Sequence, residues 1–285
     1  MARFVRWGGY AIAAAAVLLV ILAAAIWVLS WQKLRGASTA PVQLATPTAA
    51  QLADAPRMLT VLRCDGCHDK NLAGDLFFDE PNVARIYAPN LTAVAAKASD
   101  QQLARAITRG IGTDGRALVI MPSATFSRLE PGEVAAIIAA IRAKPKVGQP
   151  SPPRQVGFLG RIGLVTGKFH TTPEQFAQYD MKFPIDVGAQ FRTGQHIAAS
   201  NCAECHGADV GGGEAEPGLH APDLAIVGAY DPAAFKALMR TGVPPGGRKL
   251  KLMDEIARDS LSHMTDTEIE QLYAYLQARA QRLSR

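Results

Sequence analysis

The amino-acid sequence predicts an all-α protein, with an N-terminal membrane-spanning helix followed by two small helical domains in tandem. Three observations support this fold class. They are a long apolar stretch near the N-terminus, two identical cysteine-histidine motifs, and a repeated order of helical segments around each motif. The chain of 285 residues is long enough for two domains of about 100 residues each.

The composition is typical of a folded protein. Hydrophobic residues make up 48% of the chain and charged residues 19%, which excludes a disordered protein. The net charge of +5 is concentrated in the first 36 residues, which hold four basic and no acidic residues; the remainder holds 26 basic and 25 acidic residues. A balance so close to neutral, without a basic run, excludes nucleic acid as a partner.

Residues 1–36 predict a transmembrane anchor. They contain an uncharged stretch of 26 residues made mostly of Ala, Val, Leu and Ile, and about 20 apolar helical residues suffice to cross a bilayer. Trp7 and Tyr10 at one end, and Trp27 and Trp31 at the other, lie where interfacial aromatic residues belong. A cleaved signal peptide is the alternative, but its apolar region is normally only about 7 to 15 residues long.

Residues 37–53 are expected to tether this anchor to the first domain, because they are rich in Ala, Thr and Pro and lack aromatic residues. We expect the first domain at residues 54–143 and the second at residues 187–285. The connection between them, residues 144–186, contains six prolines and one apolar patch. A structureless connection of this length is uncommon, so it is either an interdomain linker or a partly ordered strap.

Every cysteine belongs to one of two copies of Cys-x-x-Cys-His, at residues 64–68 and 202–206. This pattern is typical of c-type haem attachment, in which both thiols form thioethers with the porphyrin and the histidine ligates the iron. Two intervening residues in a helical turn place both sulfurs along one haem edge, and the next residue brings the imidazole under the iron. The predicted residues are Cys64, Cys67 and His68, and Cys202, Cys205 and His206.

Two other kinds of site use Cys-x-x-Cys. A thioredoxin-type redox motif gives no reason for a following histidine in both copies. A zinc site built from two such pairs spaces them by about 15 to 20 residues, whereas 134 residues separate the pairs here. The sequence therefore favours two covalently bound haem c groups.

The two halves repeat beyond the motifs. Each contains an Ala-Pro-Asn/Asp-Leu sequence, an amphipathic helical segment, a Gly-Arg pair, a methionine five residues after that arginine, and a closing helix. In the first half these features lie at residues 88–91, 100–109, 115–116, 121 and 131–143, and in the second half at 221–224, 231–240, 247–248, 253 and 266–283. Thr265 and Glu268 form a predicted capping box at the start of the last helix.

Both halves resemble class I cytochrome c domains, and the tandem is similar to the multi-haem cytochrome c subunits of membrane-associated bacterial dehydrogenases. The resemblance covers residues 54–143 and 187–283. In that family a methionine in the loop before the last helix is the distal iron ligand, and a proline carbonyl accepts a hydrogen bond from the proximal imidazole. The resemblance implies these roles for Met121 and Pro89 in the first domain, and for Met253 and Pro222 in the second.

The first domain departs from the family pattern. The family's first helix often carries a glycine that lets an aromatic residue of the last helix pack closely, and the second domain has Gly194 together with Tyr273 and Tyr275. In the first domain Pro56 takes the place of that glycine, and Ile138 and Ala140 take the places of the tyrosines. We therefore expect a looser helix crossing in the first domain.

The remaining candidate residues have weaker assignments. Arg116 and Arg248 are expected either to pair with haem propionates or to be exposed loop residues. Core packing is expected for Met239 and Met264, and no ligand role is expected for Met58, before the first motif, or for Met181, between the domains. Surface or loop positions are expected for His170, His196, His220 and His263.

An iron held by histidine on one side and methionine on the other exchanges electrons but has no vacant position for a substrate. The sequence therefore predicts a membrane-anchored dihaem carrier that relays single electrons between redox proteins, with its domains in the periplasm of a bacterium and a single pass through the inner membrane. A dihaem peroxidase with one open haem is an alternative from the enzyme class. A fixed electron-transfer subunit of a larger dehydrogenase or oxidase is the other alternative.

Overall fold

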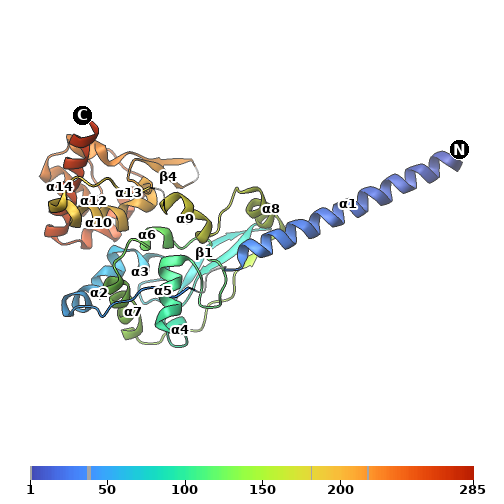
Figure 1. Cartoon of the computed structure of the whole chain (residues 1–285), viewed down its shortest axis with the longest axis horizontal. Helices are drawn as coiled ribbons and strands as arrows, with labels where there is room; N and C mark the ends of the chain where they lie inside the picture. Colours follow the sequence, from blue (N-terminus) through green and yellow to red (C-terminus); the bar gives the residue numbers. More distant parts are fainter. Residues whose placement is uncertain (1, 37–39, 181, 217) are drawn as a thin grey trace.

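The computed structural model describes every residue except 1, 37–39, 181 and 217, so Met181 and the start of the expected tether lie outside the described residues. The protein is mostly helical, with 58% of its residues in helices. Two helical bodies lie side by side, and one long helix projects from the first of them (Figure 1).

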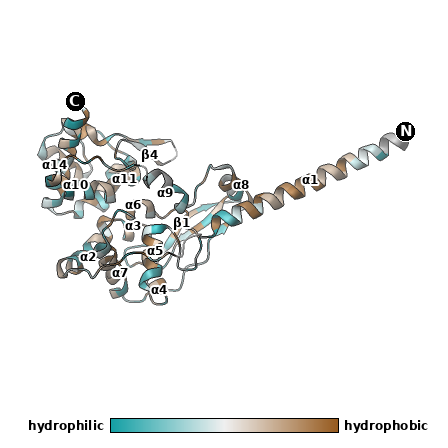
Figure 2. Cartoon of the chain, in the orientation of Figure 1, coloured by the Kyte–Doolittle hydropathy of each residue, from teal (hydrophilic) through white to brown (hydrophobic). Residues whose placement is uncertain are grey.

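The projecting helix is α1, Ala2–Leu34. Among the described residues it is the one helix long and apolar enough to cross a membrane. Most of its large apolar residues are exposed, and much of its ribbon has the hydrophobic colour in Figure 2. Its last turn joins the first body, where Leu34 accepts a backbone hydrogen bond of 3.1 Å from Ala117. The predicted apolar N-terminal helix is thereby confirmed, and its insertion in a membrane stays a prediction.

The first body is built around the first motif. Its helices are α2 Ala49–Val61, α3 Cys64–Cys67, α4 Leu91–Ala95, α5 Asp100–Arg109, α6 Ser123–Phe126 and α7 Pro131–Ala143. Helix α2 begins inside the segment that we expected to be a tether, because Thr48 and Gln51 form a capping box. Val42 and Leu44 also pack against the core of this body, so the described part of that segment belongs to the domain.

The second body repeats this order around the second motif. Its main helices are α10 Arg192–Ile197, the π-helix η2 Ala198–Cys202, α11 Ala203–His206, α12 Pro232–Thr241, α13 Leu252–Asp259 and α14 Asp266–Leu283, with the 3-10 turns η1 Ala189–Phe191, η3 Leu224–Ala229 and η4 Leu261–His263. Thr265 and Glu268 form the predicted capping box of α14. Tyr275, Phe235 and Leu272 are fully buried in its core.

The all-α prediction is wrong in one respect, because each body carries a β-hairpin between its motif and the following Ala-Pro sequence. Strands β1 Asp75–Glu80 and β2 Ala84–Ala88 pair antiparallel in the first body. Strands β4 Gly213–Glu216 and β5 Leu219–Ala221 do so in the second. Glycine, proline and asparagine at the turns give the backbone the reversals that hairpins require.

The long connection is an ordered strap. Strand β3 Gln155–Val156 adds to β2, helix α8 Phe158–Thr166 contacts α1, and helix α9 Thr172–Asp180 contacts α6. Near its start, the backbone carbonyl of Val147 accepts a hydrogen bond of 2.6 Å from the Asn90 side chain. Of the two alternatives for this segment, the structure shows the strap that packs on the domains.

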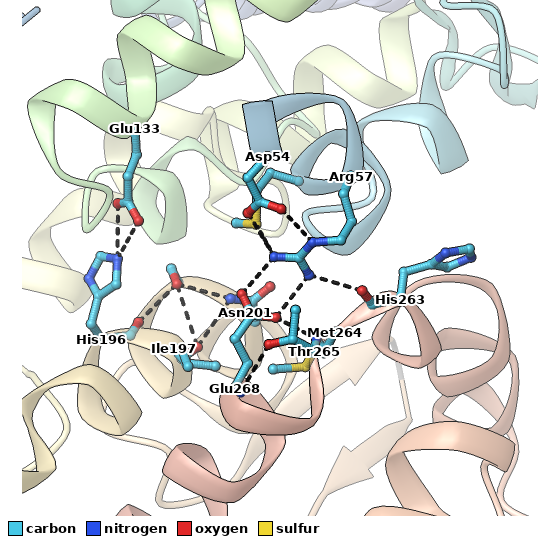
Figure 3. Close-up of polar contacts among 12 residues, drawn as sticks. Asp54, Arg57, Glu133, His196, Ile197, Asn201, His263, Met264, Thr265 and Glu268 are labelled. Carbon is cyan, nitrogen blue, oxygen red and sulfur yellow. Dashed lines mark hydrogen bonds and ion pairs between the residues drawn. The ribbon is translucent and has the colours of Figure 1, made fainter. Parts of the chain in front are cut away.

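Charged side chains join the two bodies (Figure 3). Arg57 of α2 forms an ion pair of 2.8 Å with Glu268 of α14, and it donates a hydrogen bond of 2.9 Å to the backbone carbonyl of His263. Glu133 of α7 lies 2.9 Å from the Nε2 atom of His196 of α10. These contacts hold the bodies with their motifs on adjoining faces.

Candidate functional site

The first motif forms a single helical turn. Arg63 precedes it in the left-handed region, with φ of 59°, and the backbone amide of His68 closes the turn onto the carbonyl of Cys64 at 2.9 Å. The side chain of His68 is buried, with 7% of its surface exposed, and its Nδ1 atom lies 2.7 Å from the carbonyl oxygen of Pro89. Burial lowers the pKa of His68, so the ring is held neutral.

The loop that carries Pro89 is fixed by its neighbours. A Cβ atom on Gly74 would lie 2.6 Å from the backbone of Ala88 and Asn90, so this close approach and its φ of +82° need glycine. Asn90 is fully buried, caps α4, and donates side-chain hydrogen bonds to the carbonyls of Val147 and Gln149. The strap therefore helps to hold the proline carbonyl against the histidine.

The second motif has the same contact. His206 Nδ1 lies 2.8 Å from the carbonyl oxygen of Pro222, and burial lowers the pKa of His206. Asp223 caps the following turn, as Asn90 does in the first body. Its carboxylate also accepts a hydrogen bond of 2.6 Å from Arg279, which fixes the end of the proline loop to the closing helix α14.

The backbone that follows the two motif histidines repeats the same hydrogen bonds. The carbonyl of each motif histidine accepts from a glycine amide six residues later, Gly74 at 2.9 Å and Gly212 at 2.8 Å. A fully buried residue four positions after each histidine has a positive φ, which is uncommon for its type: Leu72 at 61° and Val210 at 54°. The carbonyl of Leu72 accepts a hydrogen bond from the amide of Leu91, two positions after Pro89. The carbonyl of Val210 accepts one from the amide of Leu224, two positions after Pro222.

The cysteines do not have the character of a catalytic dithiol. Burial raises the pKa of Cys64 to about 12 and that of Cys202 to about 12, whereas a reactive redox cysteine has a lowered pKa. Within the described part of the chain, no group of three or more His, Cys, Asp or Glu side chains is placed to hold a metal ion. The raised pKa values of these thiols do not favour the thioredoxin-type alternative.

The donor set of each motif fits a haem. A hydrogen bond from Nδ1 to a proline carbonyl fixes the tautomer of the imidazole and leaves the Nε2 lone pair for a metal. The resemblance implied this contact for His68 with Pro89 and for His206 with Pro222, and the structure has both contacts. Each histidine follows directly on its two cysteines, so a porphyrin bonded to the cysteines would place its iron at Nε2.

The two predicted distal methionines lie in different local structures. Met121 sits in a turn before α6, and its carbonyl accepts a hydrogen bond of 3.0 Å from Thr172 of the strap. Met253 lies within helix α13 and not in an irregular loop. Both side chains are partly buried against the core of their own body, and their ligation of iron stays a prediction.

The competing methionines among the described residues pack in the cores, whereas three of the competing histidines are exposed and the fourth, His196, lies half-buried within α10 and not at the expected surface or loop position. Met239 and Met264 are buried in the second core, and Met58 packs against both cores. His196 pairs with Glu133. The side chains of His170, His220 and His263 are exposed.

The two arginines proposed for propionates occupy exposed loops. Arg116 forms an ion pair with Asp114, and its backbone lies beside that of Arg35 at the end of α1. The loop alternative therefore describes Arg116 better, because its guanidinium already has a carboxylate partner. Arg248 is exposed in the loop that precedes α13, and its role stays a prediction.

The two motifs touch each other. Arg63, directly before the first motif, forms an ion pair with Glu204, which lies inside the second motif. The hydroxyl of Tyr179, from α9 of the strap, donates a hydrogen bond of 3.1 Å to the carbonyl of Ala203 and accepts one of 3.2 Å from Thr125 of α6. No local pattern predicts this junction, because its four elements lie far apart in the chain.

Comparison with known proteins identifies the second body. Residues 191–280 match the family model described as cytochrome c, and this range contains the second motif, Pro222 and Met253. A search of curated proteins finds no match to the chain. Residues 191–280 are thus a cytochrome c domain, which implies covalently bound haem c and supports haem-based electron transfer.

Proposed function

We propose that this protein is a membrane-anchored electron carrier with two covalently bound haem c groups, one in each body. The observation that carries the second haem is the repeat of the histidine-proline contact and of the surrounding backbone hydrogen bonds in the first body. The first body lies outside the matched range of 191–280, so this repeat is the argument for treating it as a second haem domain.

When bound, haem c supplies an iron that changes between the ferrous and ferric states, and a methionine ligand raises its reduction potential relative to other ligation. The chain's own residues orient and shield this group. His68 and His206 are held by proline carbonyls in the tautomer that binds iron, and the hydrogen bond increases the donor strength of the ring. Met121 and Met253 are the proposed distal ligands that close the remaining coordination positions.

The contact between the motifs supports transfer between the two haems. In each motif the cysteines mark the edge at which the porphyrin would be attached, and the ion pair of Arg63 with Glu204 brings these two edges together. Electrons would therefore cross between the bodies at this junction. Donor and acceptor proteins outside the chain would complete the relay. If the protein is a fixed subunit of a larger dehydrogenase or oxidase, electrons would cross between its two haems at the same junction.

The proposed location follows from the chemistry of attachment. In the family that the sequence resembles, haem is bonded to such motifs outside the cytoplasmic membrane. With α1 as a single span, the N-terminus would be cytoplasmic and both bodies would lie in the periplasm of a bacterium, anchored to the inner membrane.

A haem count tests this proposal. The purified full-length protein should contain two haems per chain by pyridine haemochrome absorbance. The double variants C64A/C67A and C202A/C205A should each retain one. If the C64A/C67A variant keeps the same haem content as the unaltered chain, the first body is not a haem domain and the proposal is wrong.

The junction is tested by the rate of electron transfer between the haems after one has been reduced by a short radiolytic pulse. Replacing Arg63 with Gln should slow this step, because the edges lose the ion pair that joins them. The matched control is Arg57→Gln, which removes a contact between the bodies elsewhere. Equal rates for R63Q and R57Q would contradict a role for the junction itself.

A further inference from the structure

Helix α8 packs on the end of α1 that meets the first body (Figure 1). The guanidinium of Arg161 lies 3.6 Å from the centre of the Trp27 ring, and its Nη1 donates a hydrogen bond of 2.9 Å to the hydroxyl of Ser30. Lys33 forms an ion pair of 2.7 Å with Glu174 of the following helix α9. The strap is thus fixed to the last two turns of α1.

These contacts set the depth of α8 relative to a bilayer. With a rise of 1.5 Å per residue, a hydrocarbon core of about 30 Å takes about 20 helical residues. The uncharged stretch of α1 is centred near residue 19, so such a core would end near Ser30. Trp27 and Ser30 then lie at the boundary between acyl chains and headgroups, and α8, which contacts both, lies at the same level.

The outward face of α8 has the composition of an interfacial segment. Phe158 and Leu159 expose 48% and 53% of their surfaces at the start of the helix, and Phe169 exposes 45% just after its end. Two basic residues, Arg161 within the helix and Lys168 just after it, belong to the same segment. Aromatic and basic residues together are typical of segments that lie in the headgroup layer.

We propose that α8 docks on the lipid surface of the membrane that α1 spans, with Phe158, Leu159 and Phe169 inserted at the boundary with the acyl chains. Lipid is the favoured occupant because Arg161 fixes α8 to Trp27 and Ser30 of α1, and the exposed apolar surface of α1 is the proposed membrane span. The inference rests on that span, which is part of the proposed function.

This docking would fix the orientation of the globular part of the protein. A single membrane helix alone leaves a domain free to tilt, whereas a second point of attachment beside it restricts the tilt. The chain continues from α8 into α9, whose Tyr179 bonds both bodies at the junction of the motifs. The membrane surface and that junction would therefore keep a fixed distance and orientation.

The test measures the depth of a nitroxide label in the full-length haem protein, reconstituted as one copy per nanodisc of phosphatidylethanolamine and phosphatidylglycerol. The label is placed on α8 by Leu159→Cys. Two reference labels are placed by Leu19→Cys in the middle of α1 and by Gln281→Cys at an exposed position of α14. The native cysteines are bonded to haem under the proposed function, so the unaltered chain should take up no label.

A label at position 159 should collide with a water-soluble nickel chelate several-fold less often than the label at position 281, and more often with oxygen. Equal nickel accessibility at positions 159 and 281, with position 19 protected, would overturn the docking of α8 and leave the anchor intact. Nickel access at position 19 would overturn the span and the docking together. Protection at position 159 that requires two or more copies per nanodisc would mean that a second chain, and not lipid, covers the patch.

Discussion

The two bodies surround their motifs with the same backbone hydrogen bonds, but they differ in how the helix before the motif meets the closing helix. In the second body a Cβ atom on Gly194 would lie 2.1 Å from the carbonyl oxygen of Gln271 and 2.6 Å from Cβ of Tyr275. The helices α10 and α14 therefore cross at a glycine, and Tyr275 fills the core with no exposed surface. In the first body Pro56 lies within α2, and α2 packs against α7 over a core to which Ala55 and Ala140 both belong.

The chain also enters the motifs differently. In the first body α2 ends at Val61, and Arg63 turns the backbone through the left-handed region into the motif. In the second body the helix continues through a π-helical turn, Ala198–Cys202, directly into α11. Such π-turns occur often at functional sites because they insert one residue without ending the helix.

The comparison shows that two different helix crossings can support the same backbone contacts around a motif histidine. The contacts that touch the motif histidines are shared, and they are made by backbone amides and carbonyls that tolerate sequence change. The helix crossing differs, and it is made by side chains. The body that has the glycine-tyrosine crossing is the one that matches the cytochrome c family model.

The largest effect is expected from the distal ligands. Met121→Ala and Met253→Ala should each abolish the near-infrared methionine-iron band of one haem and lower its reduction potential by about 0.1 V, a fraction of the roughly 0.8 V that axial ligands cover. Spectroelectrochemistry of each variant would measure both changes. The unaltered ferrous protein should not bind carbon monoxide.

Carbon monoxide binding by one haem of the unaltered protein would contradict that assignment and favour the peroxidase alternative. A loss of the band in M121A but not in M253A would sharpen the comparison, because Met253 lies within a helix. The first body would then have the closed haem and the second the open one.

Substitutions at the two helix crossings should change the stability of their bodies in opposite directions. Gly194→Ala should destabilise the second body by about 1 to 3 kcal/mol, because the added methyl overlaps the backbone of α14. Pro56→Ala should stabilise the first body by about 1 kcal/mol or more, since it restores a helical amide and removes an unfavourable ring from an exposed helix position. Hydrogen exchange of peptides from α10 and α2 would measure the two bodies separately.

If the backbone amides of α10 exchange no faster in G194A than in the unaltered chain, the close crossing at Gly194 is not needed for the stability of the second body. Destabilisation of the first body by P56A would show that its packing requires the proline. Each helix crossing would then depend on the residue found there.

The smallest effect is expected from pH. The hydrogen bond to Glu133 raises the pKa of His196 above its usual 6.5. Burial opposes ionisation of Glu133, but the hydrogen bond and charge of His196 outweigh it and lower the pKa of that carboxylate below its usual 4.5. The pair therefore stabilises the contact between bodies most strongly between about pH 4.5 and 6.5, by about 1 kcal/mol or less.

This stabilisation should be lost as the pH rises through the raised pKa of His196, and again as it falls through the lowered pKa of Glu133. Interdomain distances from paired spin labels should broaden above about pH 6.5, and His196→Gln should remove that change. A distance distribution in the unaltered chain that does not vary from pH 5 to pH 9 would contradict this role of the pair.

Local pattern was sufficient for much of the fold. The helices at residues 100–109, 131–143 and 266–283 were predicted with the bounds that the structure has, because capping residues and apolar spacing are encoded within each segment. The short hairpins were missed, although Pro81 and Asn82, as turn residues between two segments with aromatic residues, carry a weak hairpin signal. Nothing in the strap's proline-rich composition predicted that Tyr179 would meet the second motif, and nothing around Arg63 predicted its ion pair with Glu204.

The sequence alone determined which groups meet at each motif, since the two thiols and the imidazole that are proposed to bind haem follow one another in the chain and need only a helical turn to converge. Only the tertiary structure decided which groups surround that chemistry. Pro89 and Pro222 reach their histidines after hairpins of different length, and Glu204 meets Arg63 across 141 residues. Such pairings depend on how whole elements pack, because loop closure and core burial are properties of the complete fold and not of any local segment.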